Sequence, residues 1–276
     1  MCALAGVTRS GYYRHWRERR PLQEETVVRD RIQKAALQQR HYGYRRITQS
    51  LRREGFCVNH KRVLRILRED NLLCLCKKSF VPATTQSSHR YPAWPNLAKR
   101  VTPMTTDQLW VADITYIRLD EAFVYLAVIL DAFSRKVVGW ALRDHMKTEL
   151  TLEALTMALE NRSITPGLIH HTDQGIQYAC TAYIDTLQSH GIQPSQSRPG
   201  CPYDNAMAES FMKTLKYEEI HVSQYRNIDH LRTAMTEFIE TVYNKTRLHS
   251  ALGYRPPEEY ETIMAIDKQI AIKPAA

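Results

Sequence analysis

Three apolar runs with strand character follow one another between residues 109 and 143, and they constrain the fold more than any other part of the sequence. They read LWVADITYIRL, AFVYLAVILDAF and KVVGWALR, separated by short turns at residues 120–121 and 134–135. β-Branched and aromatic residues are enriched in strands, and turns of this length join antiparallel neighbours. The sequence therefore predicts an antiparallel meander of three strands.

Helical and strand patterns alternate in the rest of this region. Helices are predicted over residues 148–161, 178–189, 205–220 and 228–247, and strands over residues 167–172 and 192–197. A meander followed by alternating helices and strands is typical of a mixed sheet with helices packed on it. We therefore predict an α/β fold in which a mixed five-stranded sheet is flanked by helices.

The N-terminal third shows helical periodicity instead. Helices are predicted over residues 24–39, 44–54 and 59–70, with Gly55 placed to end the second and Asn59 a favourable N-cap for the third. Two helices joined by a short turn containing glycine form the helix-turn-helix layout. A small all-α helix-turn-helix domain is therefore expected ahead of the sheet.

Charge is distributed unevenly along the 276 residues. Residues 1–103 carry a net charge of +15 and residues 104–276 carry −6. On the third predicted helix Lys61, Arg65 and Arg68 form a basic stripe beside Arg62, which suits the major groove or the phosphates of DNA. The alternative is a solvated face on a helical bundle. We favour a nucleic-acid grip joined to a separate unit.

Composition changes across residues 79–106, which contain four prolines and many small polar residues, so this stretch is a predicted linker. The expected divisions are a basic N-terminal segment (1–22), a helix-turn-helix-like domain (23–78), the linker (79–106), the sheet domain (107–262) and a C-terminal tail (263–276). No apolar run approaches membrane-spanning length and no signal peptide is evident, so a soluble cytoplasmic protein is expected.

Three acidic residues lie at positions where burying a carboxylate costs free energy or where a carboxylate could bind a ligand. Asp113 lies inside a predicted strand, and Asp173 ends the hydrophobic run GLIHHTD. Glu209, separated from Asp173 by 35 residues, belongs to a helix whose inner face is apolar. Carboxylate oxygens suit Mg²⁺ or Mn²⁺, and a pair of such ions can support phosphoryl transfer. We therefore predict that the three acids hold two ions together.

Other polar residues near these acids have more modest interpretations. Asp131 also ends a predicted strand, but the serine and arginine that follow in LDAFSR favour a role in stabilising the turn. His171 either contacts phosphate or is a core histidine with its hydrogen bonds satisfied. Asn205 lies one helical turn before Glu209, and we expect it to orient the backbone or the carboxylate there.

Several stretches of the sequence together resemble one known family. WVADITYI, VILDAFSRKVVGW, HTDQGIQY, SRPGCPYDNAMAESFMKTLK and YNKTRLHSALGYRPPEEY are similar to the integrase-like transposases of the IS3 family of bacterial insertion sequences. HYGYRRITQSLRREG resembles the helix-turn-helix segment of the same proteins. The resemblance extends over most of the chain.

The resemblance implies an RNase H-like catalytic domain with a D,D(35)E triad, and Asp113, Asp173 and Glu209 occupy the matching positions. It implies metal-dependent cleavage of DNA at the ends of a transposable element, followed by attack of the freed 3′-hydroxyl on another phosphodiester. Asp113 is assigned to both ions, Asp173 to one and Glu209 to the other. Lys216 lies seven residues after Glu209, matches the family's basic residue and is expected to contact DNA.

The resemblance also implies partners. These are DNA, as insertion-sequence ends and as target, other copies of the chain in a homo-oligomeric active complex, and an upstream protein part that the family joins by ribosomal frameshifting. The expected location is the bacterial cytoplasm, at the nucleoid. Tyr243, Asn244, Arg247 and His249 form a polar cluster that the family shares, and docking of the last predicted helix is its expected role.

Three other functions fit parts of the sequence. A non-catalytic DNA-binding regulator of transposition would need only the basic half, although the three acids argue against it. A tyrosine recombinase is suggested by fifteen tyrosines and by Arg247 and His249, and it would form a covalent phosphotyrosyl adduct. A metal-dependent nuclease would release 3′-hydroxyl ends without joining them.

Overall fold

The computed structural model describes residues 8, 23–74, 93–119, 122–198 and 202–272. The chain divides into two compact units, Met1–Lys78 and Ser79–Ala276, and each is described by itself. Apart from one residue, the predicted basic segment 1–22 lies outside the described residues, as does the first half of the predicted linker.

The first unit contains the three predicted helices. They are α2 (Gln23–Gln38), α3 (Tyr44–Arg53) and α4 (His60–Glu69). Each contributes fully buried aliphatic side chains to one core: Ile32, Ile47, Leu51, Val63 and Ile66. The Asn59 side chain accepts a hydrogen bond from the Lys61 amide at 2.9 Å, and Gly55 after α3 has a φ of +89°. The predicted N-cap and helix stop are therefore confirmed.

Five strands form one mixed sheet in the described part of the second unit. The meander consists of β1 (Leu109–Arg118), β2 (Phe123–Asp131) and β3 (Val137–Arg143), which pair antiparallel. β4 (Ile169–Thr172) runs parallel to β1, and β5 (Gln193–Gln196) runs parallel to β4, which gives the order β3-β2-β1-β4-β5. The predicted five-stranded mixed sheet is therefore confirmed, and its arrangement is RNase H-like.

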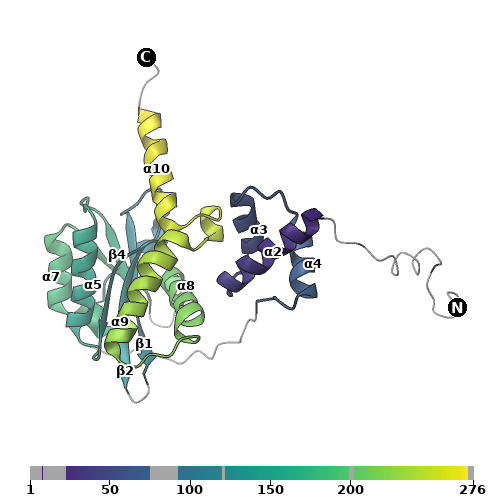
Figure 1. Ribbon diagram of the computed structural model, residues 1–276. Coiled ribbons are helices and arrows are strands. Elements are labelled where there is room, and N and C mark those ends of the chain that lie inside the picture. The colour runs from purple at the N-terminus through teal and green to yellow at the C-terminus, as the bar shows by residue number, and fades with distance from the viewer. Residues whose placement is uncertain (1–7, 9–22, 75–92, 120–121, 199–201, 273–276) are drawn as a thin grey trace. The chain divides into compact units, whose positions relative to one another are not determined.

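Helices cover both faces of this sheet (Figure 1). On one face, α5 (Thr148–Asn161), α6 (Ile176–Ala179) and α7 (Thr181–Ser189) pack around Trp110 and Ile129. On the other, α8 (Ala206–Leu215) and α9 (Ile228–Thr236) pack on Val111 and Val128. A Cβ at Gly139 would lie 2.2 Å from the Ala154 carbonyl oxygen, so glycine allows α5 to approach β3. Alternate residues of each strand thus belong to separate cores.

Several helices differ from the predicted outlines. The predicted helix at 205–220 consists of a 3₁₀ turn, η2 (Pro202–Asn205), then α8, then a π-helical turn, η3 (Lys216–Ile220). The helix at 228–247 consists of α9 and a π-helical stretch, η4 (Glu237–Thr246), and the helix at 178–189 is divided at Cys180 between α6 and α7. Short 3₁₀ turns also occur at η1 (Ala98–Arg100) and η5 (Ser250–Leu252).

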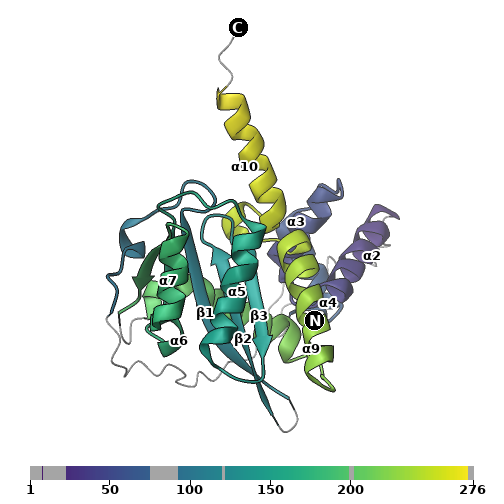
Figure 2. The ribbon, with the colours of Figure 1, turned by 90° about the vertical axis from the view of Figure 1, so that its left-hand side faces the viewer.

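A further helix, α10 (Pro257–Ile272), was not predicted. It spans the predicted division at residue 262 and extends away from the sheet (Figures 1 and 2). Pro257 at its first position and Glu258 and Glu259 in its first turn are ordinary helix-start signals, so the sequence did contain the information. None of the described helices combines the length and apolar character needed to cross a membrane.

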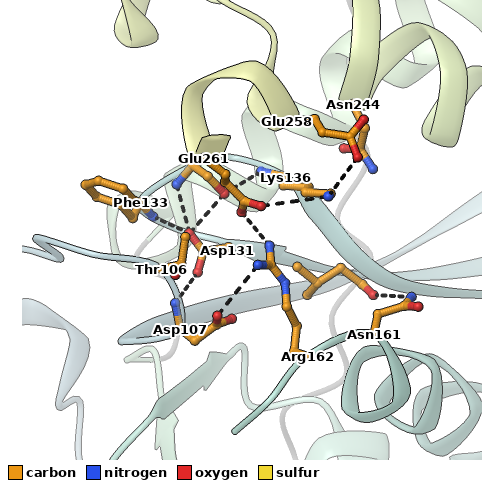
Figure 3. Close-up of polar contacts among 12 residues, drawn as sticks. Thr106, Asp107, Asp131, Phe133, Lys136, Asn161, Arg162, Asn244, Glu258 and Glu261 are labelled. Atoms are coloured by element: carbon orange, nitrogen blue, oxygen red, sulfur yellow. Dashed lines mark hydrogen bonds and ion pairs between the residues drawn. The ribbon is translucent and has the colours of Figure 1, made fainter. Parts of the chain in front are cut away.

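A polar network anchors the base of α10 to the sheet (Figure 3). Arg162 forms an ion pair with Glu261 of α10, and Lys136 at the start of β3 reaches Glu258 at 3.4 Å. Asp131 lies at the centre of this region and is fully buried.

The Asp131 carboxylate is held by the turn that follows it. One carboxylate oxygen accepts hydrogen bonds from the amides of Phe133 (2.9 Å) and Ser134 (2.8 Å) and from the Ser134 hydroxyl (3.1 Å). The other accepts from the Asp107 amide at 2.7 Å. The predicted role in stabilising the turn is therefore confirmed.

The polar cluster near the C-terminus also docks secondary structure. The Asn244 side chain pairs with both the amide and the carbonyl of Val137, each at 3.0 Å, and so continues the hydrogen bonding at the start of β3. Arg247 forms a two-pronged ion pair with Glu218 of η3, at 2.8 and 2.7 Å. The ring of His249 packs edge-on against Tyr243, with centroids 4.8 Å apart. The expected docking role is therefore confirmed.

Candidate active site

The register of β1 with β4 brings two of the predicted acids to the same place. The last paired residues of the two strands are Val111 and His171. Asp113 and Asp173 each lie two residues beyond that pair, where β4 ends and β1 continues paired with β2 alone. Since the strands are parallel, the two acids lie at the same level of the sheet.

Asp113 is half-buried, and its carboxylate accepts a 2.9 Å hydrogen bond from the Ile114 amide. The pKa of Asp113 is raised from 3.8 to about 7, first by burial and then by the negative charges of Asp173 and Glu209, against the opposing effects of the Ile114 amide and Lys216. A buried acid beside two like charges is costly to ionise. Asp173, Glu209 and Lys216 therefore lie close enough to Asp113 for their charges to act on it.

Asp173 is oriented by the tight turn between β4 and α6. Its carboxylate accepts a hydrogen bond from the Gly175 amide at 3.0 Å. A Cβ on Gly175 would lie 3.0 Å from the same carboxylate oxygen, closer than most side-chain contacts. Gly175 is a residue whose role the sequence alone did not reveal: its lack of a side chain leaves room for the Asp173 carboxylate.

Glu209 lies in the first turn of α8, on the flank of a helix fixed by its apolar side. Ala208, Phe211 and Leu215 are buried against the sheet, whereas Glu209 is half-buried. Among the residues that the structure describes, no three His, Cys, Asp or Glu side chains are already arranged to hold a metal ion. The charges of the three acids therefore act on one another, but their side chains are not arranged as a set of metal ligands. That they hold ions together stays a prediction.

Lys216 begins η3, the π-helical turn that continues α8. Its ammonium group lies over the ring of Tyr116, with Nζ 4.9 Å from the centroid. Burial lowers the pKa of Lys216, while the charge of Asp113 acts to raise it. Tyr116 thus positions this lysine beside the part of β1 that extends beyond its pairing with β4. An aromatic residue inside a strand is common, so the sequence gave no signal for this role.

Asn205 connects the start of α8 to the strand that carries Asp113. Its side-chain amide donates a 2.9 Å hydrogen bond to the carbonyl of Ala112, the residue immediately before Asp113. Asn205 is itself buried. Its contact is therefore to the backbone beside the acid, one of the two alternatives expected from the sequence.

His171 is fully buried, between Ser195 and Ser197. Its Nδ1 lies 2.8 Å from the Ser195 hydroxyl, and its Nε2 lies 3.4 Å from the Ser197 hydroxyl. Burial lowers the pKa of His171, against the effect of Asp204. Of the two interpretations, a satisfied core histidine agrees with these contacts better than a phosphate ligand does.

The basic stripe on α4 is not uniform. Lys61 and Arg68 are exposed, and Arg62 is half-buried. Arg65 is exposed too, but it forms ion pairs of 2.7 Å with Glu25 of α2 and Glu69 of α4. Because acids of the same unit pair with its charge, Arg65 serves to hold α2 against α4 in addition to any contact with DNA.

The sequence matches the integrase core domain family over residues 105–202, a second integrase core domain family over residues 190–257, and an HTH-like domain family over residues 23–80. The simian T-cell lymphotropic virus intasome in complex with PP2A regulatory subunit B56 gamma is a similar solved structure, with a TM-score of 0.49 and 16% identity, covering 84% of this chain and 74% of that one. The family matches define an integrase core protein with a helix-turn-helix-like domain.

Curated relatives are similar over nearly the whole chain. An uncharacterized 31 kDa protein of insertion element IS600 from Shigella sonnei is 38% identical over 94% of this chain and 97% of its own length. The transposase InsF for insertion sequence IS3A from Escherichia coli K12 is 35% identical over 95% of this chain and 92% of its own length. The chain belongs to the IS3 family of insertion-sequence transposases, and it acts as a polynucleotidyl transferase in DNA transposition.

Proposed function

We propose that Asp113, Asp173 and Glu209 are the catalytic acids of this transposase. The observation that supports the proposal most directly is the pKa of Asp113, raised to about 7 by burial and by the charges of the other two acids. A protein gains nothing in stability from placing three carboxylates together in a half-buried site. Such a cluster is typical of sites that bind cations or move protons.

The donor set fits hard divalent cations. It consists of carboxylate oxygens, which Mg²⁺ and Mn²⁺ prefer, and Asp113 has a carboxylate whose ionisation a cation would favour. We propose two ions, with Asp113 contacting both, Asp173 one and Glu209 the other. Two ions would supply activation of the attacking oxygen and stabilisation of the leaving oxygen.

The residues of the chain orient the reaction around that chemistry. Gly175 holds the Asp173 carboxylate, and Asn205 holds the backbone before Asp113. In cleavage, a water oxygen would attack phosphorus, the bond to the 3′ oxygen would break, and that oxygen would leave as a hydroxyl after taking a proton. In strand transfer, the same hydroxyl would lose its proton and attack a phosphorus of target DNA, and the bond from that phosphorus to the target's 3′ oxygen would break, so that this oxygen leaves as a hydroxyl after taking a proton.

Lys216 is the proposed DNA contact beside the acids. Its ammonium group is half-buried, lies over Tyr116 and interacts with Asp113. A cation at this place would neutralise a phosphate that approaches the carboxylates, which lowers the repulsion between DNA and the site. Lys61, Arg62 and Arg68 of α4 are the proposed contacts of the first unit, with Arg65 contributing less because of its ion pairs.

We further propose the partners and setting that this reaction requires. The DNA partners are the ends of the insertion sequence and the target. Two ends must be joined to one target, so we propose an oligomer of this chain, together with the upstream frameshift product, in the bacterial cytoplasm at the nucleoid.

The test uses the full chain with a plasmid that carries the ends of its own element. Asp113→Asn, Asp173→Asn and Glu209→Gln should each abolish cleavage and joining in Mg²⁺ or Mn²⁺, while binding of the same DNA in a gel-shift assay persists. Joined 3′ ends distinguish a transposase from a nuclease, and a covalent protein adduct under denaturing electrophoresis would indicate a tyrosine recombinase. Cleavage that survives Asp113→Asn would contradict the assignment.

A further inference from the structure

The backbone at the end of the predicted linker binds side chains of the edge strand β5. The Trp94 amide donates to the Gln196 side-chain oxygen at 3.0 Å, and the Leu97 amide donates to the Ser195 hydroxyl at 2.9 Å. Both side chains are buried. Residues 94–97 therefore pack against the edge strand of the second unit and cover polar groups of β5 that would otherwise be exposed.

The Ser195 hydroxyl contacts the Leu97 amide on one side and the His171 ring on the other. Ser195 is only 1% exposed, and its hydroxyl also lies 2.8 Å from Nδ1 of His171. The Ser195 oxygen has two lone pairs, one of which accepts from the Leu97 amide, and its hydroxyl has one proton, for which Nδ1 lies within hydrogen-bonding distance. Donation from Ser195 to Nδ1 gives that proton an acceptor and leaves the proton of the neutral ring on Nε2.

The other side of the imidazole leads to the peptide that precedes Asp173. Nε2 lies 3.4 Å from the Ser197 hydroxyl, a longer contact than that of Nδ1. The Ser197 hydroxyl donates to the carbonyl of Thr172 at 2.9 Å, and the Ser197 amide donates to the same oxygen at 2.8 Å. That carbonyl belongs to the peptide bond between Thr172 and Asp173. A series of hydrogen bonds thus runs from the Leu97 amide through Ser195, His171 and Ser197 to the peptide that precedes Asp173.

We propose that His171 is a positioning residue for Asp173, and that it is held in place by Ser195 and, through Ser195, by the backbone of Leu97. The inference rests on the proposed role of Asp173 in binding divalent ions. Second-layer partners of this kind fix the direction of a metal-binding carboxylate, and losing one commonly weakens metal binding by about tenfold to a hundredfold. His171 would then act on the reaction without contacting DNA or ions itself.

The neighbouring His170 provides a matched control on the same strand. It is also buried, and burial lowers its pKa to about 3, but it belongs to the opposite face of the sheet. Its Nε2 lies 2.8 Å from the hydroxyl of Tyr183 on α7. A general effect of removing a buried imidazole should therefore occur at both positions, whereas a positioning effect should occur only at His171.

Paired substitutions separate the two sides of the ring. His171→Asn keeps an acceptor near the place of Nδ1, and His171→Gln keeps a polar group near the place of Nε2. Leu97→Pro removes the amide donor at a φ of −80°, which proline can adopt, and Leu97→Ala keeps the donor while shortening the side chain. Ser195→Ala removes the central hydroxyl, and Ser134→Ala removes a buried hydroxyl remote from His171.

The first readout is Mn²⁺ binding to the full chain by titration calorimetry, with circular dichroism melting to confirm folding. Ser195→Ala, His171→Gln and Leu97→Pro should weaken Mn²⁺ binding by about tenfold or more. His171→Asn should weaken it as well, because it removes the Nε2 contact through which the ring reaches Ser197, whereas Leu97→Ala, Ser134→Ala and His170→Gln should leave it within about twofold. Unchanged Mn²⁺ binding in Ser195→Ala and in both His171 variants would overturn the proposal.

The second readout is the nitrogen NMR spectrum of the His171 ring, which does not depend on metal or DNA. The inference requires Nδ1 without a proton in wild type, and a proton found on Nδ1 would overturn it even if Ser195→Ala fails to fold. If Asp173→Asn abolishes Mn²⁺ binding while the Ser195 and His171 variants bind normally, only this inference fails. If Asp173→Asn itself binds Mn²⁺ and cleaves DNA normally, the proposed function fails.

Discussion

Asp113 and Asp131 are buried or half-buried aspartates on neighbouring strands, and they lie in opposite surroundings. The Asp131 carboxylate accepts three hydrogen bonds on one oxygen and one on the other. The Asp113 carboxylate accepts one from the Ile114 amide and is close to the charges of Asp173 and Glu209. Burial raises the pKa of both, but donors surround Asp131, whereas acids surround Asp113.

The comparison distinguishes a carboxylate that serves the fold from one that serves a ligand. The Asp131 carboxylate is satisfied by hydrogen-bond donors of the folded chain itself, as Figure 3 shows. The Asp113 carboxylate accepts from the Ile114 amide but lies beside two acids, so its charge is best satisfied by something outside the chain. The same conservative substitution at the two positions should therefore have opposite consequences.

The largest expected effect is on catalysis. Asp113→Asn removes a charge that ion binding requires, so DNA cleavage should fall by about a thousandfold or more, as is usual when a member of a catalytic set is lost. Rates are measured with the full chain and Mn²⁺ on DNA that carries the element's ends. Asp131→Asn, assayed at a temperature where it remains folded, is the control and should retain most of the rate.

The next effect is on stability as a function of pH, in the absence of divalent ions. The pKa of Asp113 rises from 3.8 to about 7 on folding, so this group stabilises the folded state fully below pH 3.8 and loses that contribution as pH rises to about 7. An asparagine does not ionise, so Asp113→Asn avoids this decrease in stability at higher pH. The variant should exceed wild type in the free energy of unfolding by up to about 4 kcal/mol at pH 8.

Denaturant titrations at several pH values measure this difference. It should grow between pH 4 and pH 7 and stay constant above that range, and added Mn²⁺ should stabilise wild type more than the variant. A difference that is constant from pH 4 to pH 8 would mean that the Asp113 carboxylate has an ordinary pKa.

Asp131→Asn should show the opposite sign. The new amide group would direct donors toward the amides that Asp131 now accepts from, so the free energy of unfolding at pH 8 should fall by about 2–3 kcal/mol. Thermal melting followed by circular dichroism checks this. A variant as stable as wild type would show that the hydrogen bonds around Asp131 contribute little.

A smaller effect is expected at Gly175. Alanine there would place a Cβ 3.0 Å from the Asp173 carboxylate and 3.2 Å from the Gln177 side-chain oxygen. Since the backbone angles of Gly175 suit any residue, the change should displace Asp173 without straining the turn. Cleavage should fall by about tenfold, as for a misplaced ligand, with a change in stability below about 1 kcal/mol.

The smallest effect concerns the paired arginine of α4. Glu25→Gln breaks an exposed ion pair with Arg65, so stability should fall by no more than about 0.5 kcal/mol. Arg65→Ala should weaken DNA binding less than Arg68→Ala does, because Arg65 is already paired with acids. Gel-shift titrations over a range of salt concentrations measure both, and equal losses would show that Arg65 contacts DNA despite its partners.

The sequence predicted the parts of the fold that depend on local patterns. The antiparallel meander, the N-cap at Asn59 and the turn role of Asp131 all follow from residue type and spacing. The π-helical turns were missed because they depend on tertiary contacts such as the ion pair between Arg247 and Glu218. The helix α10 was missed although its proline and acidic start were visible in the sequence.

The site was predictable in its acids but not in its support. Asp113 drew attention because aspartate is disfavoured inside a strand, and the spacing to Glu209 came from the family pattern. Tyr116 and Ser195 are ordinary residues for their strands, and only the folded structure brings them beside Lys216 and His171. These contacts cross between elements, so no local pattern encodes them. Gly175 is local to Asp173, but a glycine in a turn does not by itself reveal that it leaves room for a carboxylate.

The most direct test of the central claim is a crystal structure of the full chain grown with Mn²⁺ and recorded at the manganese absorption edge. The account predicts anomalous density for two ions within bonding distance of the carboxylates of Asp113, Asp173 and Glu209, with Asp113 contacting both. Well-ordered carboxylates without manganese between them, or manganese held elsewhere in the chain, would contradict it.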